Sequence, residues 1–142
     1  MVKVTVVSRR VRFSTKGEVD MVDVTHMVQR AVEESGLKKG IVTVFVPGST
    51  GAVTTIEYEP GLLKDFPRML EKIAPRGEEY EHHLRWHDWN GHSHCRAALL
   101  GPSLTVPFED GRLQLGTWQQ IVFVELDVKP RERELILQLI GE

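Results

Sequence analysis

The sequence predicts an α+β fold, in which two main helices pack on a largely antiparallel sheet. Runs of β-branched residues recur along the chain, two segments change to a helical period, and turn residues separate the runs. The chain has 142 residues, of which 41% are apolar and 27% are charged, as is common in soluble globular domains. We therefore expect a single domain over residues 1–142.

The first third of the chain predicts two strands and a helix. Residues 2–13 are β-branched and partly alternate, which is typical of a strand. Residues 14–18 form a turn, so residues 19–24 are expected to return as the second arm of a hairpin. From Thr25 the apolar residues follow a helical period, and Gly36 is a suitable residue to end that helix.

The middle of the chain predicts a central strand, a second strand and the other main helix. Residues 40–47 are almost continuously apolar, which favours a central strand. Residues 48–51 break this run, and residues 52–59 resume as a strand. A helix is expected over residues 60–74, where Pro67 must kink it or mark its true first turn.

The last part of the chain returns to strands after a segment, residues 81–95, that has no clear periodicity. Residues 104–108 and 112–115 flank an Asp-Gly turn and predict a hairpin. Residues 119–128 and 133–140 complete the expected strands.

Charge and targeting signals narrow the classes of partner. A net charge of −2 argues against electrostatic binding to nucleic acid or to an anionic membrane. No signal-peptide pattern or bilayer-spanning apolar run is found. The single cysteine, Cys95, rules out an intramolecular disulfide and suits a reducing compartment. We expect a cytoplasmic protein.

Five of the six histidines lie between His82 and His94, and imidazole is both a common metal ligand and an acid–base group. His92 and His94 form an H-x-H unit. On a strand both imidazoles could reach one ion, whereas on a helix they would diverge by about 200° and would not chelate. Further ligands could come from His82, His83 or His87, giving an open catalytic or a closed structural site.

Each of these features also has a purely structural interpretation. The H-x-H pair could be solvated or could serve as a hydrogen-bonding pair. Trp86 and Trp89 are better explained by core or subunit-interface packing than as the wall of a ligand site. Cys95 is expected to be a small buried residue rather than a ligand.

Carboxylates elsewhere are candidates only if the fold brings them near the histidines. Glu57 and Glu59 alternate along the expected strand and would share one face. Asp65 lies early in the following helix, where a carboxylate also stabilises the helix dipole.

Two turns could bind a ligand. The turn over residues 48–51 offers backbone N–H groups and two hydroxyls that could cradle a phosphate, although a plain hairpin turn is an alternative. It lacks the ending of a P-loop. Thr117 and Gln119 could donate hydrogen bonds to a ligand or could simply satisfy backbone groups.

Several longer motifs together resemble the YjbQ family, small proteins associated with secondary thiamine-phosphate synthase activity. The matching segments are Val44-Phe45-Val46-Pro47, Ser49-Thr50, Glu57, Tyr80-Glu81-His82, residues 90–94, residues 100–107, Gly111-Arg112-Leu113 and residues 115–119. The resemblance spans almost the whole chain and is strongest over residues 40–141.

The resemblance implies a compact protomer with a curved, mixed sheet, assembled as a homotrimer. It also implies a polar pocket near the subunit boundaries, with histidines around a divalent metal, Zn or alternatively Mg. His82 and His94 match the family's histidines, Glu57 and Asp65 match acidic positions, and Asn90 matches its asparagine.

One departure from the family pattern affects the expected metal ligands. Many relatives read His-Thr-Thr where this chain has residues 48–50, so one histidine is missing here. His92 is extra relative to the common Asn-x-x-Ala-His pattern. We hypothesise that His82, His92 and His94 bind one divalent ion.

The implied reaction joins a pyrimidine pyrophosphate to a thiazole phosphate and releases pyrophosphate. The candidate residues are Glu57, Asp65 and Asn90 for catalysis and Ser49, Thr50, Thr117 and Gln119 for substrate binding. A metal-dependent hydrolase using the same histidines, with Glu57 or Asp65 as base, is one alternative. A non-catalytic trimer with a structural metal is another. The expected partners are other copies of the chain and a small phosphorylated or polar ligand.

Overall fold

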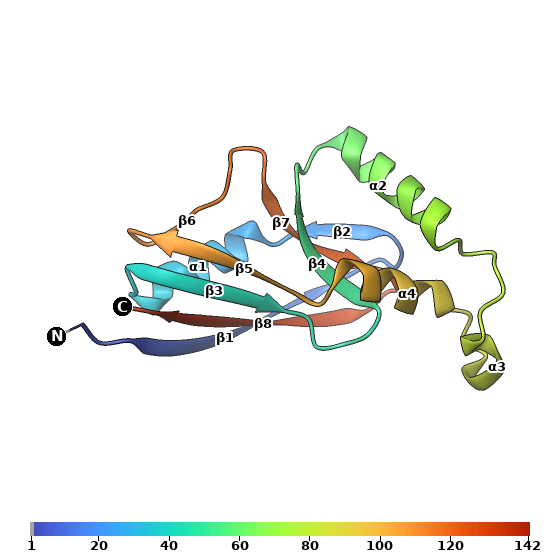
Figure 1. Cartoon of the computed structure of the whole chain (residues 1–142), viewed down its shortest axis with the longest axis horizontal. Helices are drawn as coiled ribbons and strands as arrows, with labels where there is room; N and C mark the ends of the chain where they lie inside the picture. Colours follow the sequence, from blue (N-terminus) through green and yellow to red (C-terminus); the bar gives the residue numbers. More distant parts are fainter. Residues whose placement is uncertain (1) are drawn as a thin grey trace.

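The computed structural model describes residues 2–142, and this part of the chain forms an α+β fold with eight strands and four helices (Figure 1). The strands are β1 (Thr5–Ser14), β2 (Asp20–Asp23), β3 (Lys39–Phe45), β4 (Gly51–Ile56), β5 (Ser103–Glu109), β6 (Arg112–Leu113), β7 (Gln120–Glu125) and β8 (Glu132–Gly141). The helices are α1 (Thr25–Ser35), α2 (Pro60–Ile73), α3 (His82–Trp86) and α4 (Gly91–Leu100). The fold class is confirmed, with four helices in place of the two expected.

The strands form a five-stranded sheet in the order β1-β8-β3-β5-β6 and a three-stranded sheet in the order β2-β7-β4. Every strand pair in the described chain is antiparallel, so the expected mixed pairing is wrong for these residues. β3 lies in the centre of the larger sheet, as its apolar run predicts. The expected hairpin over residues 2–24 is also wrong, because β1 pairs with β8 and β2 pairs with β7.

Two apolar cores lie on opposite faces of β7, and this explains the failed hairpin. Ile121 and Phe123 belong to the first core, with α1 and the five-stranded sheet, whereas Val122 and Val124 belong to the second. The second core also contains Leu70 of α2 and Ala97 of α4. β2 pairs with β7 in the three-stranded sheet, and its Met21 belongs to the second core. β2 therefore lies in a different sheet from β1.

The two main helices begin and end as the sequence predicts. Gly36 caps α1 in a left-handed conformation with φ 73°, which glycine adopts without steric cost. α2 begins at Pro60, and the Glu59 side chain accepts hydrogen bonds from two backbone N–H groups of its first turn. Pro67 lies inside this helix. Glu57 and Glu59 therefore lie beyond β4, which corrects the strand expected over residues 52–59.

The histidine segment is helical, contrary to the lack of periodicity in its sequence. α3 and α4 occupy most of it, and α3 projects from the end of the molecule beyond α4 (Figure 1). α4 ends before Gly101, at φ 97°, and Pro102 follows. A glycine and a proline in these positions are recognised helix stop signals.

The outer face of the five-stranded sheet carries exposed apolar side chains. Val6, Ile41, Phe45 and Ile140 are each at least 41% exposed. They belong to alternating positions whose neighbours, such as Val42 and Leu139, are buried. Polar side chains such as Ser8 and Gln138 lie between them, so the face that points away from the first core is mixed.

Two glycines cross at the end of this sheet. Gly40 faces Gly141, and a Cβ added to Gly40 would lie 2.1 Å from the Ile140 carbonyl oxygen. A Cβ on Gly141 would lie 2.2 Å from the Lys39 carbonyl oxygen. Only glycine allows the two backbones to approach this closely.

None of the helices described within residues 2–142 is long and apolar enough to cross a membrane.

Candidate functional site

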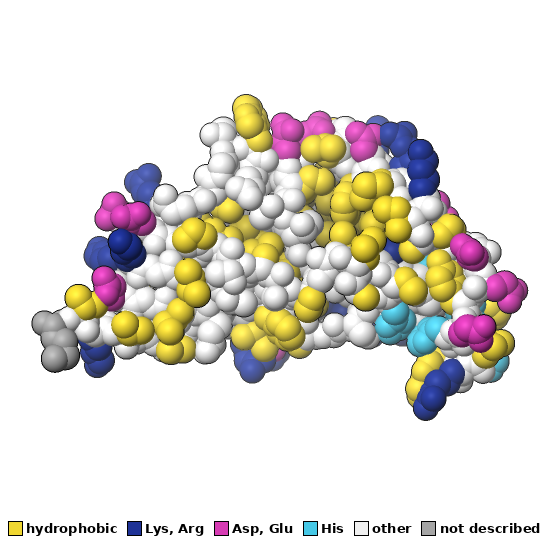
Figure 2. Space-filling view, viewed as in Figure 1, with side chains coloured by type: hydrophobic (Ala, Val, Ile, Leu, Met, Phe, Trp, Pro, Cys, Tyr) yellow, Lys and Arg dark blue, Asp and Glu magenta, His cyan; other side chains and the backbone are white. Residues whose placement is uncertain are grey.

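His82 and His94 lie side by side at the end of the molecule that carries α3. His82 begins α3, His94 lies one turn into α4, and their ring centroids are 4.5 Å apart. The histidines gather visibly at this end in the space-filling view (Figure 2). A pocket of about 360 Å³ adjoins His94 and is lined by Gly48, Ser49 and small residues of α4. The pair thus borders a space that a small molecule could enter.

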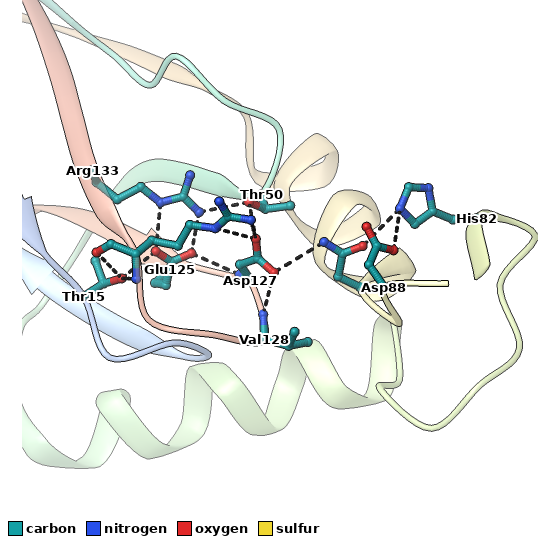
Figure 3. Close-up of polar contacts among 10 residues, drawn as sticks. Thr15, Thr50, His82, Asp88, Glu125, Asp127, Val128 and Arg133 are labelled. Carbon is teal, nitrogen blue, oxygen red and sulfur yellow. Dashed lines mark hydrogen bonds and ion pairs between the residues drawn. The ribbon is translucent and has the colours of Figure 1, made fainter. Parts of the chain in front are cut away.

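Asp88 and Asn90 complete a tight polar cluster around His82. The His82 Nε2 atom lies 3.0 Å from the amide oxygen of Asn90 and 3.2 Å from Asp88 Oδ1. The Asn90 amide atom that faces His82 also lies 2.8 Å from Asp88 Oδ1. The Asn90 amide therefore lies within hydrogen-bond distance of both His82 and Asp88, which face each other in Figure 3.

A buried acidic residue, Asp127, lies behind this cluster. Its side chain is 1% exposed and accepts hydrogen bonds from Arg131, the Val128 backbone and Asn90. Burial by itself would raise the pKa of Asp127, but these hydrogen bonds outweigh it and hold the pKa below 3.8. Asp127 is therefore a carboxylate that fixes the Asn90 side chain from the rear.

A second buried pair supports the loop on the other side of Asp127. Arg133 donates from Nε and Nη2 to the two oxygens of Glu125, at 2.8 and 2.5 Å. Arg133 Nη2 also donates to Thr50 Oγ1 at 2.9 Å, and Thr50 Oγ1 lies 3.2 Å from Asp127 Oδ2. Thr15 closes the network by donating to Glu125 at 2.6 Å (Figure 3). The expected ligand residue Thr50 is thus held between two ion pairs.

His94 is kept neutral by its surroundings. Burial, followed by the neighbouring His82, lowers the pKa of His94 below 6.5, and Asp88 and Asp127 oppose this only in part. A neutral imidazole near pH 7 can bind a metal ion or accept a proton.

His92 does not join His82 and His94, so the expected three-histidine arrangement is wrong. The H-x-H unit lies on a helix, where its imidazoles diverge, and His92 is 0% exposed. Its Nε2 atom lies 2.7 Å from Glu18 Oε2, and Arg96 reaches the same carboxylate at 3.8 Å. His92 is therefore part of a buried contact between α4 and the chain before β2.

The neighbouring Cys95 differs from expectation, and for the two tryptophans only the core alternative is wrong. Cys95 lies on the helix α4 rather than on a strand, and its side chain is exposed. Trp86 and Trp89 are 60% and 63% exposed, so they are not core residues of the protomer. His83 is buried and packs against Trp89, with ring centroids 4.5 Å apart.

The loop that carries Asp88 has an unusual backbone. His87 and Trp89, on either side of it, have φ values of 56° and 59°. Non-glycine residues adopt this left-handed region at a cost, and such residues often occur at functional sites. These two residues flank Asp88, whose carboxylate lies 3.2 Å from His82 Nε2.

The other expected site residues lie elsewhere in the protomer. Glu57 and Thr117 line a separate pocket of about 490 Å³ together with Trp118. Gln119 donates to Thr55 Oγ1 at 3.2 Å. Asp65 is exposed on α2 and pairs with Arg68 three residues later. Ser49 is exposed at the pocket beside His94.

Sequence reasoning missed three residues of the cluster and its support, namely Asp88, Asp127 and Arg133. Asp88 lies inside the histidine segment, so its position alone could have marked it. Asp127 and Arg133 follow or belong to the last two strands and meet the loop only through the tertiary fold. No local pattern identifies them.

Side chains that commonly bind metal ions are few around His82. Between residues 2 and 142, no three or more His, Cys, Asp or Glu side chains are placed together to hold a metal ion. The cluster contains His82 and Asp88, and its third converging atom belongs to the Asn90 amide. These residues would offer an ion one imidazole nitrogen and oxygen ligands only with the Asn90 amide oxygen turned toward Asp88.

Comparisons with known proteins identify the family. The family model described as "UPF0047 protein YjbQ-like" matches residues 9–142. A UPF0047 protein of Archaeoglobus fulgidus is 41% identical over 126 residues, covering 89% of this chain and 95% of the relative. A UPF0047 protein of Methanothermobacter thermautotrophicus is 43% identical over 128 residues, covering 90% and 87%.

Solved structures agree with this assignment. The crystal structure of a YbjQ-like protein of unknown function from Sulfolobus solfataricus has a TM-score of 0.93 at 35% identity, covering 99% of this chain and 100% of that one. A hypothetical protein from Aeropyrum pernix has a TM-score of 0.84 at 36% identity, covering 94% and 99%. Both sequence and fold therefore show that the chain belongs to the YjbQ (UPF0047) family.

Proposed function

We propose that His82, Asp88 and Asn90 bind a divalent metal ion beside His94, and that this centre acts on a small phosphorylated ligand. The observation that carries the proposal is the convergence of the three donor atoms, which lie 2.8–3.2 Å from each other. Adjacent ligands of an octahedral ion at about 2.1 Å are separated by about 3.0 Å. The spacing of the three atoms therefore suits a shared cation.

The Asn90 amide has two possible orientations, and only one of them turns its oxygen toward Asp88. Turning the Asn90 amide would point its nitrogen at Asp88 Oδ1, 2.8 Å away, and remove the clash of two oxygens. The turn would also place the amide oxygen against Asp127 Oδ1, at 3.3 Å, where the nitrogen now donates. The turned amide would gain contacts to Asp88 and His82 and lose one hydrogen bond to Asp127. In the proposed site a cation would hold the amide oxygen toward Asp88 and leave the bond to Asp127 in place.

The mixed donor set indicates the class of metal. One imidazole nitrogen with carboxylate and amide oxygens suits Zn, while the two oxygens also suit Mg. Asp127 holds the Asn90 amide from behind, as second partners of metal ligands commonly do. When bound, such an ion would stabilise negative charge on a departing pyrophosphate.

The protein groups around the centre supply positioning and proton transfer. His94, neutral because its pKa is lowered, faces the pocket lined by Gly48 and Ser49 and can accept a proton from a reacting group. Thr50 is held by Arg133 and Asp127, so the loop beneath the pocket is rigid.

Thiamine-phosphate synthesis is the reaction that we propose to test first, because the family resemblance implies it. A pyrophosphate leaving group requires a cation and hydrogen-bond donors close together, which this end of the molecule offers. Glu57 and Thr117 keep a proposed catalytic and a proposed binding role, but in one protomer they line a different pocket.

A homotrimer would resolve this separation by placing the second pocket of one copy near the metal centre of the next. Two surfaces support self-association: the outer face of the five-stranded sheet, with its exposed apolar side chains, and the exposed Trp86 and Trp118. Exposed apolar area of this kind commonly marks a protein interface. Sedimentation equilibrium at several concentrations should give three times the 16.2 kDa chain mass; a monomer at all concentrations would exclude the trimer.

The metal proposal is tested by calorimetric titration of chelator-treated protein with Zn²⁺ and Mg²⁺. Asp88→Asn should weaken the binding about 10-fold or more, because it removes a charged ligand. Asp65→Asn is the matched control, since it makes the same change on an exposed carboxylate of α2. Equal affinity in wild type and Asp88→Asn would reject the site.

The reaction is tested by pyrophosphate release. A synthase should release pyrophosphate only when both the pyrimidine and the thiazole precursor are present. Turnover of a phosphoester panel with water alone would instead favour the hydrolase. Chelation that dissociates the trimer, with no turnover to lose, would favour a structural metal.

A further inference from the structure

We propose that Arg133 and the loop over residues 48–50 form a phosphate-binding subsite, with Arg133 Nη1 as the charged donor. Its placement at the reaction centre rests on the proposed function, but phosphate binding itself does not. The subsite would hold the phosphate of an ionised small-molecule ester or an inorganic phosphate.

Arg133 is a buried guanidinium with one free end. Its side chain is 9% exposed, and Nε and Nη2 are held by Glu125 and by Thr50 Oγ1. Nη1 makes no hydrogen bond to any residue from 2 to 142. Because the fork is fixed by a carboxylate that is 0% exposed, the direction of Nη1 is fixed as well.

The free end of Arg133 points at a glycine. Nη1 lies 3.3 Å from the position that a Cβ of Gly48 would occupy. Gly48 has φ 145°, in the region that residues with side chains rarely adopt. The space beside Nη1 is therefore kept clear by the lack of a side chain at this position.

The loop adds neutral donors to the charged one. In the described part of the chain, the backbone N–H groups of residues 48, 49 and 50 donate to no acceptor. Successive free amides form concavities that bind anions, and a guanidinium beside them favours phosphate geometry. A tetrahedral phosphate has enough oxygens to accept from both sources.

The pocket next to the loop has space for the rest of such a ligand. It has a volume of about 360 Å³, and His94 forms part of its wall. Gly48 and Ser49 line the same pocket as His94, so a phosphate held at the loop would lie beside this space. Glu125 balances the charge of Arg133, so the affinity for free phosphate should be moderate rather than tight.

The first test uses metal-free protein and inorganic phosphate or pyrophosphate at constant ionic strength, with binding measured by calorimetry. Gly48→Ala should weaken binding about 10-fold or more, because its methyl group would lie 3.3 Å from Nη1. Gly101→Ala is the matched control: φ there is also positive, at 97°, but nothing lies within 4 Å of the added Cβ. The control should bind phosphate as the wild type does.

A second variant tests the guanidinium itself. Arg133→Lys keeps the positive charge beside Glu125 but removes the planar fork, so phosphate affinity should fall about 10-fold. If Arg133→Lys fails to fold, the phosphate affinity of Gly48→Ala decides whether the subsite exists. Wild-type affinity in Gly48→Ala, or no phosphate binding by the wild type at millimolar concentrations, would overturn the subsite. Phosphate binding without any turnover would remove the proposed reaction and leave the subsite intact.

Discussion

Two faces of the same helix, α4, use histidine for different purposes. On one face His92 is 0% exposed and contacts Glu18, which in turn is close to Arg96. On the other face His94 is partly exposed, lies against His82 and borders a pocket. The two residues are two positions apart in the chain and share no contact in this arrangement.

The comparison teaches that the neighbours of a histidine, rather than its type or spacing, decide what it can do. A histidine enclosed by a carboxylate and packed side chains stabilises the fold, and water or a ligand cannot reach it. One at the edge of a pocket, with a lowered pKa, can exchange protons or bind an ion. Variants of each should therefore affect different measurements.

The largest effect should come from His92→Ala. The change would remove the imidazole beside the Glu18 carboxylate, which keeps its ion pair with Arg76 at 2.9 Å, and would open a cavity at a fully buried position. We expect a loss of about 3 kcal/mol in the free energy of unfolding, measured by urea denaturation at pH 7. Metal affinity per folded molecule should stay the same. A stable variant that no longer binds metal would reverse the assignment of the two faces.

His94→Ala should show the opposite pattern. Its unfolding free energy should stay within about 1 kcal/mol of wild type, because the ring is only partly buried. Turnover in the pyrophosphate-release assay should fall about 100-fold, as expected for loss of a general base. Unchanged turnover with normal stability would remove His94 from the chemistry.

Asp127→Asn should have an intermediate effect on stability that depends on pH. We expect a cost of about 2 kcal/mol near pH 7, because Arg131 and the Val128 amide lose an ionised acceptor. The folded pKa of Asp127 is lowered, so its contribution is complete above the unfolded value near 3.9 and is lost as pH falls through the folded pKa. Denaturation of metal-free protein should show wild type and variant converging below about pH 4. A constant difference down to pH 2 would contradict the lowered pKa.

Cys95→Ala should have the smallest effect. The thiol is free and exposed on α4. The variant should lie within about 0.5 kcal/mol of wild type. In the native wild type, a thiol reagent should label one cysteine per chain without denaturant; protection from labelling would show that this face is covered, for example by another copy.

The fold was largely predictable because local signals and burial agree in most elements. Gly36, Pro60 and the apolar run of β3 mark their elements correctly. The hairpin expected from β1 to β2 failed because adjacency in sequence favours pairing, whereas the two cores on either side of β7 separate these strands.

The candidate site was predictable only in part, for a different reason. The concentration of histidines marked the segment, and the family resemblance singled out His82, Asn90 and His94 within it. The role of His92 depended on whether its segment is a strand or a helix, and the weak apolar period of α4 hid the helix. Asp127 and Arg133 carry ordinary surface-type charges in the sequence, and only the fold reveals that both are enclosed.

The crossing of Gly40 and Gly141 limits how the last strand can be threaded during folding. If β8 slipped by one residue along β3, a side chain would replace one of the glycines at a point where the backbones leave no room for a Cβ. The same slip would turn Leu137 and Leu139 outward. The two glycines therefore disfavour misaligned pairings of β3 and β8 by steric clash, in addition to the loss of apolar burial.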